Sequence, residues 1–180
     1  WNSAMADGGE MTGKVVMVTG AFGALGRAVV ECAGAQGFQV AAVDFASDAD
    51  LFAGTGVLAI GGVDLTEAAQ SRAAVEQVLA RHGRLDVLIN TVGGFVWQTT
   101  ADGDPAAWAR MHRLNVVTVL NACRAALPSL IQSGAGAIVN VGAYAALQAG
   151  AGMGCYAASK AGVHRLTEAL AEEVKADGVT

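Results

Sequence analysis

Tyr156 and Lys160 stand four residues apart in the segment 154–160, which reads Gly-Cys-Tyr-Ala-Ala-Ser-Lys. If this segment is helical, the phenol and the ammonium lie on one face of the helix and reach the same space. A free phenol holds its proton at neutral pH, and a fixed positive charge beside it favours the phenolate. The pair could therefore exchange protons with a substrate. Alternatively it is a chance surface pair, because tyrosine and lysine fall four apart on many helices.

A glycine-rich turn near the start of the chain could supply this pair with a cofactor. The valine-rich run 15–18 predicts a strand, and Thr19, the glycines 20, 23 and 26 and a helical pattern follow it. A strand, a tight turn and a helix start present backbone N–H groups to a pyrophosphate. The spacing is Gly-x-x-Gly-x-x-Gly, whereas the usual fingerprint is Gly-x-Gly-x-x-Gly, and Ala24 stands where many related loops have glycine.

An acidic residue follows the next predicted strand. The run 39–43 ends in Asp44, 24 residues after Gly20, and this is the interval at which a carboxylate binds the ribose 2′-hydroxyl of NAD. Alternatively Asp44 only caps the strand end. A 2′-phosphate at this place would be repelled by about 1 to 4 kcal/mol at ~4 Å, and no basic side chain stands in the loop to compensate. We therefore expect NAD(H) to be preferred over NADP(H).

The composition is typical of a soluble α/β protein and excludes several function classes. The chain has 180 residues, of which 53% are hydrophobic and 15% charged, and its net charge is −5. With no basic stripe, nucleic acid is not an expected partner. The three cysteines and three histidines follow no disulfide or metal spacing, so we expect free thiols, a cytoplasmic location and no metal site. No unbroken run of 18 apolar residues occurs, so no membrane-spanning segment is expected.

Strands and helices alternate along the rest of the chain. Further strands are predicted at 57–60, 85–90 and 137–141, and helices at 66–83, 104–133 and 156–177. Such alternation predicts an α/β fold with a doubly wound parallel sheet and helices on both faces, whose ligands bind at the carboxyl ends of the strands. We expect residues 1–12 to be a flexible tail and 13–180 to be one dinucleotide-binding and catalytic domain. Since 179–180 reads as the start of a sixth strand, we expect the C-terminal strands to be missing.

In combination, these motifs resemble those of the short-chain dehydrogenase/reductase family, over nearly all of the chain from Lys14 to Thr180. The residues that carry the resemblance are Thr19–Gly26, Asp64-Leu65, Asn90–Gly94, Asn115, Asn140-Val141, Tyr156 and Lys160. The resemblance implies a Rossmann-like fold and an oxidoreductase that transfers hydride between a nicotinamide and a carbonyl or alcohol.

The roles of single residues are implied by the same resemblance. Tyr156 would donate the proton in reduction, Lys160 would hold the nicotinamide ribose, and Asn115 would support a water that links Lys160 to solvent. An alternative for Asn115 is a helix-interior side chain that bonds to the backbone. Asp44 would bind the ribose, and Asp64 and Leu65 would contact the adenine. The full set expected to bind the cofactor is Gly20, Phe22, Gly23, Leu25, Gly26, Asp44, Asp64, Leu65, Asn90, Val92, Gly93, Val141, Tyr156 and Lys160.

One position departs from the family pattern. The serine that usually holds the substrate carbonyl, 13 residues before the tyrosine, is Ala143 here. The substrate could need no such donor, Tyr144 could supply one, or the chain could be a sensor that binds dinucleotide without turnover. Segments around residues 23–26, 92–95, 142–147 and 152–156 locally resemble the dihydropteridine reductase branch, which works without this serine on a readily reduced quinonoid ring.

Two further expectations concern the substrate and the assembly. Phe95, Trp97, Tyr144, Leu147 and Met153 could line a site for an apolar or planar substrate, or could simply pack the loops. The resemblance implies a homodimer or homotetramer that forms through the helices 104–133 and 156–177.

Overall fold

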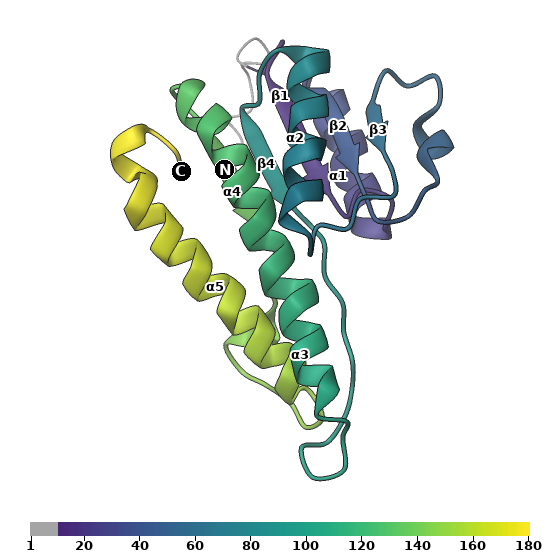
Figure 1. Ribbon diagram of the computed structural model, residues 1–180, viewed down its shortest axis with the longest axis vertical. Coiled ribbons are helices and arrows are strands. Elements are labelled where there is room, and N and C mark those ends of the chain that lie inside the picture. The colour runs from purple at the N-terminus through teal and green to yellow at the C-terminus, as the bar shows by residue number, and fades with distance from the viewer. Residues whose placement is uncertain (1–10) are drawn as a thin grey trace, which may run out of the picture.

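A parallel sheet of five strands forms the centre of the molecule (Figure 1). The computed structural model describes residues 11–180, without the side chain of Ala49. The strands, in the spatial order β3-β2-β1-β4-β5, are β1 (Val15–Thr19), β2 (Gln39–Val43), β3 (Leu58–Ile60), β4 (Val87–Asn90) and β5 (Ala137–Asn140). All four strand pairs are parallel, which confirms the predicted fold class.

Helices cover both faces of this sheet. On one face, α1 (Ala24–Ala35) packs against β1 and β2, and on the other lie α2 (Ala68–His82), α4 (Thr118–Gln132) and α5 (Gly154–Val174) (Figure 1). A shorter helix, α3 (Ala106–His112), precedes α4, and three 3-10 turns complete the fold: η1 (Ala49–Phe52), η3 (Tyr144–Ala146) and η4 (Lys175–Asp177).

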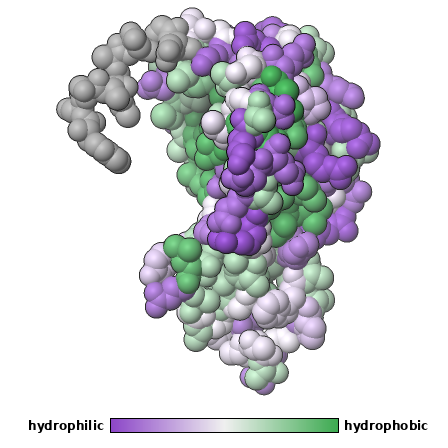
Figure 2. Space-filling model, turned by 90° about the vertical axis from the view of Figure 1, so that its left-hand side faces the viewer, coloured by the Kyte–Doolittle hydropathy of each residue, from purple (hydrophilic) through white to green (hydrophobic). Residues whose placement is uncertain are grey.

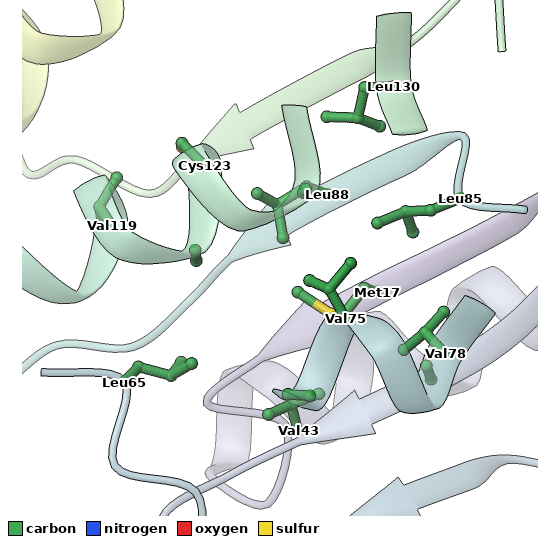
Figure 3. Close-up of a cluster of buried hydrophobic side chains, with 14 of the residues drawn as sticks. Met17, Val43, Leu65, Val75, Val78, Leu85, Leu88, Val119, Cys123 and Leu130 are labelled. Atoms are coloured by element: carbon green, nitrogen blue, oxygen red, sulfur yellow. The ribbon is translucent and has the colours of Figure 1, made fainter. Parts of the chain in front are cut away.

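The alternation of side chains along β1 and β2 explains why both faces are apolar. Val15 and Met17 point to the α2 and α4 side, where they join Leu88, Val119 and other buried side chains (Figure 3). Val16 and Val18 point to the α1 side and pack with Val30, Val40 and Phe22. Because successive residues of a strand face opposite sides, a sheet covered on both faces needs nearly continuous apolar strands.

A buried carboxylate joins the start of β1 to the segment before β4. Asp86 accepts a hydrogen bond from the Val15 N–H at 2.8 Å and two from the Arg84 guanidinium, at 2.9 and 2.6 Å. Burial alone would raise the pKa of Asp86, but the hydrogen bonds from Arg84 and Val15 outweigh it and the pKa is lowered. The carboxylate therefore stays charged and fixes how these two central strands begin.

The predicted helix 104–133 is present as one long rod that is not uniformly α-helical. Asp104 caps it by accepting the Ala106 N–H at 2.8 Å, as the sequence predicted. A π-helical segment, Arg113–Val117, which the sequence did not predict, joins α3 to α4. By length and composition alone, the helix Ala106–Gln132 could cross a membrane. Its buried side chains, including Val119, Cys123 and Leu130, belong to the core cluster of this fold.

At the C-terminal end, the backbone runs beside β5. The Thr180 N–H donates to Gly136 O at 3.0 Å, and the Ile138 N–H donates to Thr180 O at 2.7 Å. This is the bonding pattern of a parallel ladder, in agreement with the predicted start of a strand. At the other end, the predicted tail 1–12 lies mostly outside the described residues, and Met11 O accepts the Lys14 N–H just before β1.

Candidate active site

The turn after β1 brings backbone atoms very close together. Gly20 has φ of +67°, and a Cβ there would lie 2.8 Å from the Val92 N in the segment after β4. A Cβ at Gly26 would lie 2.1 Å from Gly20 O, so α1 can approach the turn only with glycine at this position. Gly23 caps α1 in extended conformation. The three glycines thus create the tight strand–turn–helix geometry in which backbone N–H groups can bind an anion.

Asp44 lies at the end of β2 beside this turn. Its Oδ2 accepts the Phe22 N–H at 2.8 Å, and its Oδ1 accepts the Ala46 N–H at 3.0 Å. The carboxylate is thereby fixed between the glycine turn and the segment after β2, with acceptor capacity left on both oxygens.

A cleft of about 470 Å³ opens at the carboxyl ends of the strands. Its lining brings together eight residues of the predicted cofactor set with seven that the set did not contain. The predicted ones are Gly20, Phe22, Gly23, Asp44, Asp64, Leu65, Val92 and Gly93, and the additional ones are Phe45, Ala46, Val63, Thr66, Thr91, Leu114 and Thr118. No lysine or arginine is among these lining residues.

Two predicted residues of the glycine turn are not part of the lining. Leu25 is 52% exposed on the first turn of α1, and Gly26 is buried beneath Gly20. The role visible for Gly26 is therefore close packing.

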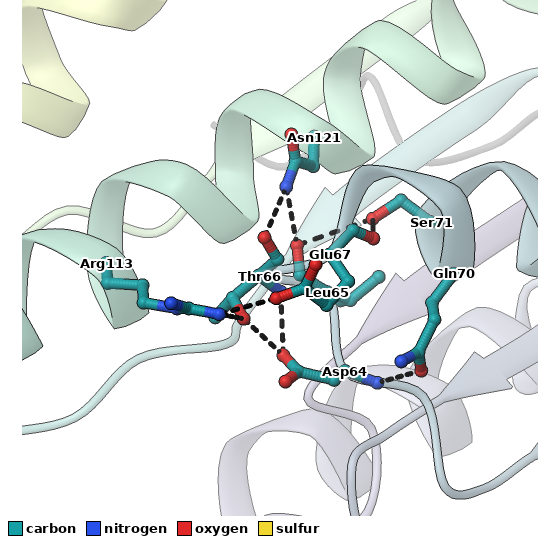
Figure 4. Close-up of polar contacts among 8 residues, drawn as sticks. All are labelled: Asp64, Leu65, Thr66, Glu67, Gln70, Ser71, Arg113 and Asn121. Atoms are coloured by element: carbon teal, nitrogen blue, oxygen red, sulfur yellow. Dashed lines mark hydrogen bonds and ion pairs between the residues drawn. The ribbon is translucent and has the colours of Figure 1, made fainter.

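Asp64 and Leu65, which were predicted to contact the adenine, lie in the segment 64–67 between β3 and α2 (Figure 4). Asp64 Oδ1 accepts hydrogen bonds from both the N–H and the hydroxyl of Thr66, at 2.9 and 2.7 Å. The Asp64 N–H donates to Gln70 Oε1 at 2.8 Å. Leu65 is 4% exposed and joins the main core.

Asn90 lies one layer behind the cleft. Its Oδ1 accepts the Thr19 hydroxyl at 2.9 Å, and its Nδ2 donates to Asn140 Oδ1 at 2.8 Å, so it connects β1, β4 and β5. The Cys123 thiol contacts the same amides, and burial raises its pKa to about 11. We infer that Asn90 fixes the sheet from within and that Cys123 remains a protonated thiol.

Lys160 is 5% exposed, and its ammonium donates to Val141 O at 2.8 Å. A Cβ at Gly93 would lie 3.0 Å from Asn115 Oδ1 and 3.2 Å from Lys160 Nζ, so glycine lets the backbone approach both side chains without crowding. Burial lowers the pKa of Lys160 below its ordinary value. Val141, Gly93 and Lys160 therefore lie together, and of these three only Gly93 belongs to the cleft lining.

Tyr156 lies one turn before Lys160 on α5, in the first turn of the helix. Its ring packs edge-to-face against Phe95, with ring centroids 4.9 Å apart and an interplanar angle of 83°. The Tyr156 carbonyl accepts the Ser159 hydroxyl at 2.7 Å. The predicted helix places both side chains of the pair on the side of α5 that faces the segments after β4 and β5.

Asn115 stands in the middle of the π-helical segment and is fully buried. Its Oδ1 accepts the Gly94 N–H at 2.8 Å, and its Nδ2 donates to Gly94 O at 3.1 Å and to Ser159 Oγ at 2.8 Å. The carboxamide thus ties the loop that carries Phe95 to the helix that carries Tyr156. This is the side-chain-to-backbone alternative that the sequence left open, here at a π turn, a feature common at functional sites.

The segment after β5 holds the position where the serine is absent. Ala143 is extended, with φ of −158° and ψ of 151°, and precedes η3. Tyr144 is 72% exposed and donates its hydroxyl to Gln148 Oε1 at 2.9 Å. A Cβ at Gly142 would lie 2.2 Å from His164 Nε2, so this imidazole of α5 occupies the space beside residue 142. No motif or spacing in the sequence indicated the contact between Gly142 and His164.

The comparisons with known proteins point to one family. The family model for short chain dehydrogenases matches residues 14–180. The chain is 35% identical over 173 residues to 1,6-dihydroxycyclohexa-2,4-diene-1-carboxylate dehydrogenase of Pseudomonas putida, covering 93% of this chain and 63% of that protein. It is 31% identical over 176 residues to 2-(S)-hydroxypropyl-CoM dehydrogenase 3 of Xanthobacter autotrophicus, covering 94% and 69%. Among the curated relatives compared, the share of the relative's own length that this chain covers ranges from 56% to 76%.

Solved structures agree with the sequence comparison. A short-chain dehydrogenase/reductase from Burkholderia xenovorans superposes with a TM-score of 0.85 at 35% identity, over 94% of this chain and 72% of that one. A short-chain dehydrogenase from Streptomyces avermitilis gives 0.86 at 32% identity, over 93% and 63%. The chain belongs to the short-chain dehydrogenase/reductase family.

Proposed function

We propose that the protein is an NAD(H)-dependent oxidoreductase that transfers hydride between the nicotinamide and a carbonyl or alcohol, with Tyr156 as proton donor and acceptor. The observation that carries the proposal is the cluster in which Lys160 Nζ bonds to Val141 O and lies beside Gly93, a residue of the cleft lining. It lies at the carboxyl ends of the strands, where ligands of such sheets bind.

The described residues fit a dinucleotide. The Gly20–Gly26 turn, which has no room for a Cβ at Gly20 or Gly26, would hold the pyrophosphate, and Asp44 would bind the adenosine ribose. Asp64 and Leu65 would form the adenine wall, while Val92, Gly93 and Lys160 would hold the nicotinamide half. When bound, the cofactor supplies or accepts the hydride.

The protein's own part is proton transfer and orientation. Tyr156 would give its phenolic proton to the substrate oxygen in reduction and take it back in oxidation. The Lys160 ammonium, one helical turn away and largely shielded from water, would stabilise the phenolate. Asn115 would act as a positioning residue through Gly94 and Ser159, and a proton path from Lys160 past the π turn remains part of the proposal.

We propose NAD(H) rather than NADP(H). Asp44 lines the cleft, and no lysine or arginine is among the described lining residues. A 2′-phosphate would therefore meet uncompensated repulsion.

A second candidate concerns the substrate. Ala143 offers no hydroxyl to polarise a carbonyl, which favours a conjugated ring that accepts or yields hydride readily, as in the dihydropteridine reductase branch. The name of the Pseudomonas putida relative also describes a cyclohexadiene ring. The remaining alternative is a sensor that binds dinucleotide without turnover. The presence of Tyr156, Lys160 and Asn115 favours an enzyme over such a sensor.

The proposal also covers the cellular location of the protein and its partners. We place the protein in the cytoplasm, since Cys32, Cys123 and Cys155 are free thiols. Its partners would be a small-molecule substrate and a second copy of the chain, with no role for nucleic acid, membrane or metal.

Calorimetry followed by a substrate screen tests the proposal. We expect NADH to bind at least ten-fold more tightly than NADPH, and NADH oxidation to appear with a member of a panel of aliphatic ketones, aryl ketones and quinonoid rings. Tyr156→Phe should abolish turnover and keep NADH binding within about three-fold. Tyr144→Phe tests the alternative donor: it should lower turnover if Tyr144 replaces the missing serine and leave turnover unchanged if it does not. Absence of binding to either dinucleotide would refute the proposal, and binding without any turnover would favour the sensor.

A further inference from the structure

We propose that Asn121 is a positioning residue for the adenine half of the cofactor, and that Arg113 is a weaker second clamp on the same segment. This inference rests on the proposed function. It concerns the segment 64–67, whose conformation is fixed by side chains of the α3–α4 rod as well as by its own contacts (Figure 4).

Asn121 makes a two-point contact with this segment. It lies on α4 and is 8% exposed, and its Nδ2 donates to Leu65 O at 3.0 Å and to Thr66 O at 3.1 Å. Figure 4 shows the amide of Asn121 pointing from α4 to these two carbonyls. The amide nitrogen thus serves both carbonyls, and removing the side chain would leave Thr66 O without this donor and Leu65 O with only the longer bond from Ser71 Oγ, at 3.4 Å.

The contact determines which way the segment faces. With the carbonyls of Leu65 and Thr66 held toward α4, Asp64, Leu65 and Thr66 remain in the lining of the cleft. The bonds within the segment, from Thr66 to Asp64, fix only its local turn. The side-chain hydrogen bonds that join it to the rod come from Asn121 and Arg113, while the Leu65 side chain packs in the core beside α4.

Arg113 reaches the same segment from the π turn. Its Nη2 donates to Thr66 Oγ1 at 3.0 Å and to Glu67 Oε1 at 2.5 Å. The side chains of Arg113 and Glu67 are 60% and 53% exposed, so solvent screens this ion pair. We therefore rank Arg113 well below Asn121.

The rod also contributes to the cleft directly. Leu114 and Thr118, which stand between Arg113 and Asn121 in the sequence, line the same cleft. Clamping the segment 64–67 to this part of the rod thus fixes the width of the adenine end, without contact between Asn121 and the reacting atoms.

The test compares a whole dinucleotide with half of one. In Asn121→Leu, which keeps a similar volume but has no donor, we expect the Kd for NADH to rise at least ten-fold. The Kd for reduced nicotinamide mononucleotide, which lacks the adenine half, should change less than two-fold. Arg113→Met should weaken NADH binding by less than three-fold. Ser133→Ala, which removes a side-chain-to-backbone bond at the far end of α4, is the matched control and should leave both affinities unchanged.

A second variant and a folding measurement keep the result interpretable. Asn121→Ser retains one short donor and should fall between wild type and Asn121→Leu, and thermal unfolding shows that each variant is folded. Equal loss of affinity for both ligands, or an NADH affinity in a folded Asn121→Leu within two-fold of wild type, overturns the inference. If the wild type binds no NADH at all, the proposed function fails first, and the two failures are thus distinguished.

Discussion

At the scale of single residues, Lys160 occupies a place where its charge is costly. The ammonium is 5% exposed and, among the described residues, donates one hydrogen bond, to Val141 O. A lysine can use three donors, and burial without full pairing disfavours the charged form. Such an arrangement is typical of a group placed to act on a ligand, since a residue kept for stability alone would be better paired.

Replacing this lysine should reveal the cost of its burial. Because burial lowers the pKa of Lys160 in the folded state, the unfolded chain binds more protons between the folded pKa and the unfolded value near ~10.5, and stability rises with pH through that window. We expect Lys160→Met to be at least as stable as wild type at pH 7 and to lose this advantage toward pH 10. Denaturant unfolding at both pH values measures the difference. A variant that is less stable at pH 7 and equal at pH 10 would contradict the argument.

The missing hydroxyl at residue 143 gives a second residue-scale prediction. If the native substrate needs no carbonyl donor, Ala143→Ser should leave its turnover within about five-fold while raising kcat/KM for simple ketones by up to ~10²–10³, the usual worth of one oxyanion donor. Ala146→Ser, on the same 3-10 turn, is the control. No gain with any ketone would indicate that residue 143 does not face the substrate oxygen.

At the scale of elements, the sequence predicted the regular strands and helices but missed the π-helical segment that interrupts the long helix. Valine-rich runs and glycine stops were enough for the five strands and the main helices, because burial on both faces imposes a simple pattern. The π-helical segment Arg113–Val117 has no such signature: the apolar spacing continues through it, and only the contacts of Asn115 with Gly94 and Ser159 show what it positions. Phe45, Leu114 and Thr118 in the cleft were missed for the same reason, since tertiary approach brings them there.

The packing of α1 on the glycine turn can be tested with two glycines of one helix. A Cβ at Gly26 would lie 2.1 Å from Gly20 O, whereas a Cβ at Gly34 would meet nothing within 4 Å. We expect Gly26→Ala to lower the free energy of unfolding by at least about 2 kcal/mol through overpacking. Gly34→Ala should raise it by about 0.5 to 1 kcal/mol, because alanine is the better helix former. Urea unfolding of both variants measures these changes, and similar values for the two would contradict the close approach.

At the scale of the whole molecule, one face remains open beside the core. Viewed from the α5 side, the surface shows apolar patches between hydrophilic side chains (Figure 2). A groove of about 260 Å³ between α4 and α5 is lined by Leu120, Cys123, Arg124, Leu127, Leu166, Leu170 and Glu173. The leucines of this groove are half-buried, so a partner that covers the groove would remove their remaining apolar surface from water. Full burial of an exposed leucine side chain contributes about 1.5 to 3 kcal/mol, and these leucines would gain the remaining part of that free energy.

We propose that two copies of the chain meet through this groove. Sedimentation of the wild type at micromolar concentration should show a dimer or tetramer, and Leu170→Glu, which places a charge in the groove, should shift it to smaller species while the fold is retained. Leu51→Glu makes the same substitution at a leucine of η1 that is 36% exposed, away from α4 and α5, and should leave the mass unchanged. A monomeric wild type would exclude this assembly. Equal dissociation by both variants would place the interface elsewhere, because a contact through α4 and α5 has no reason to sense a charge on η1.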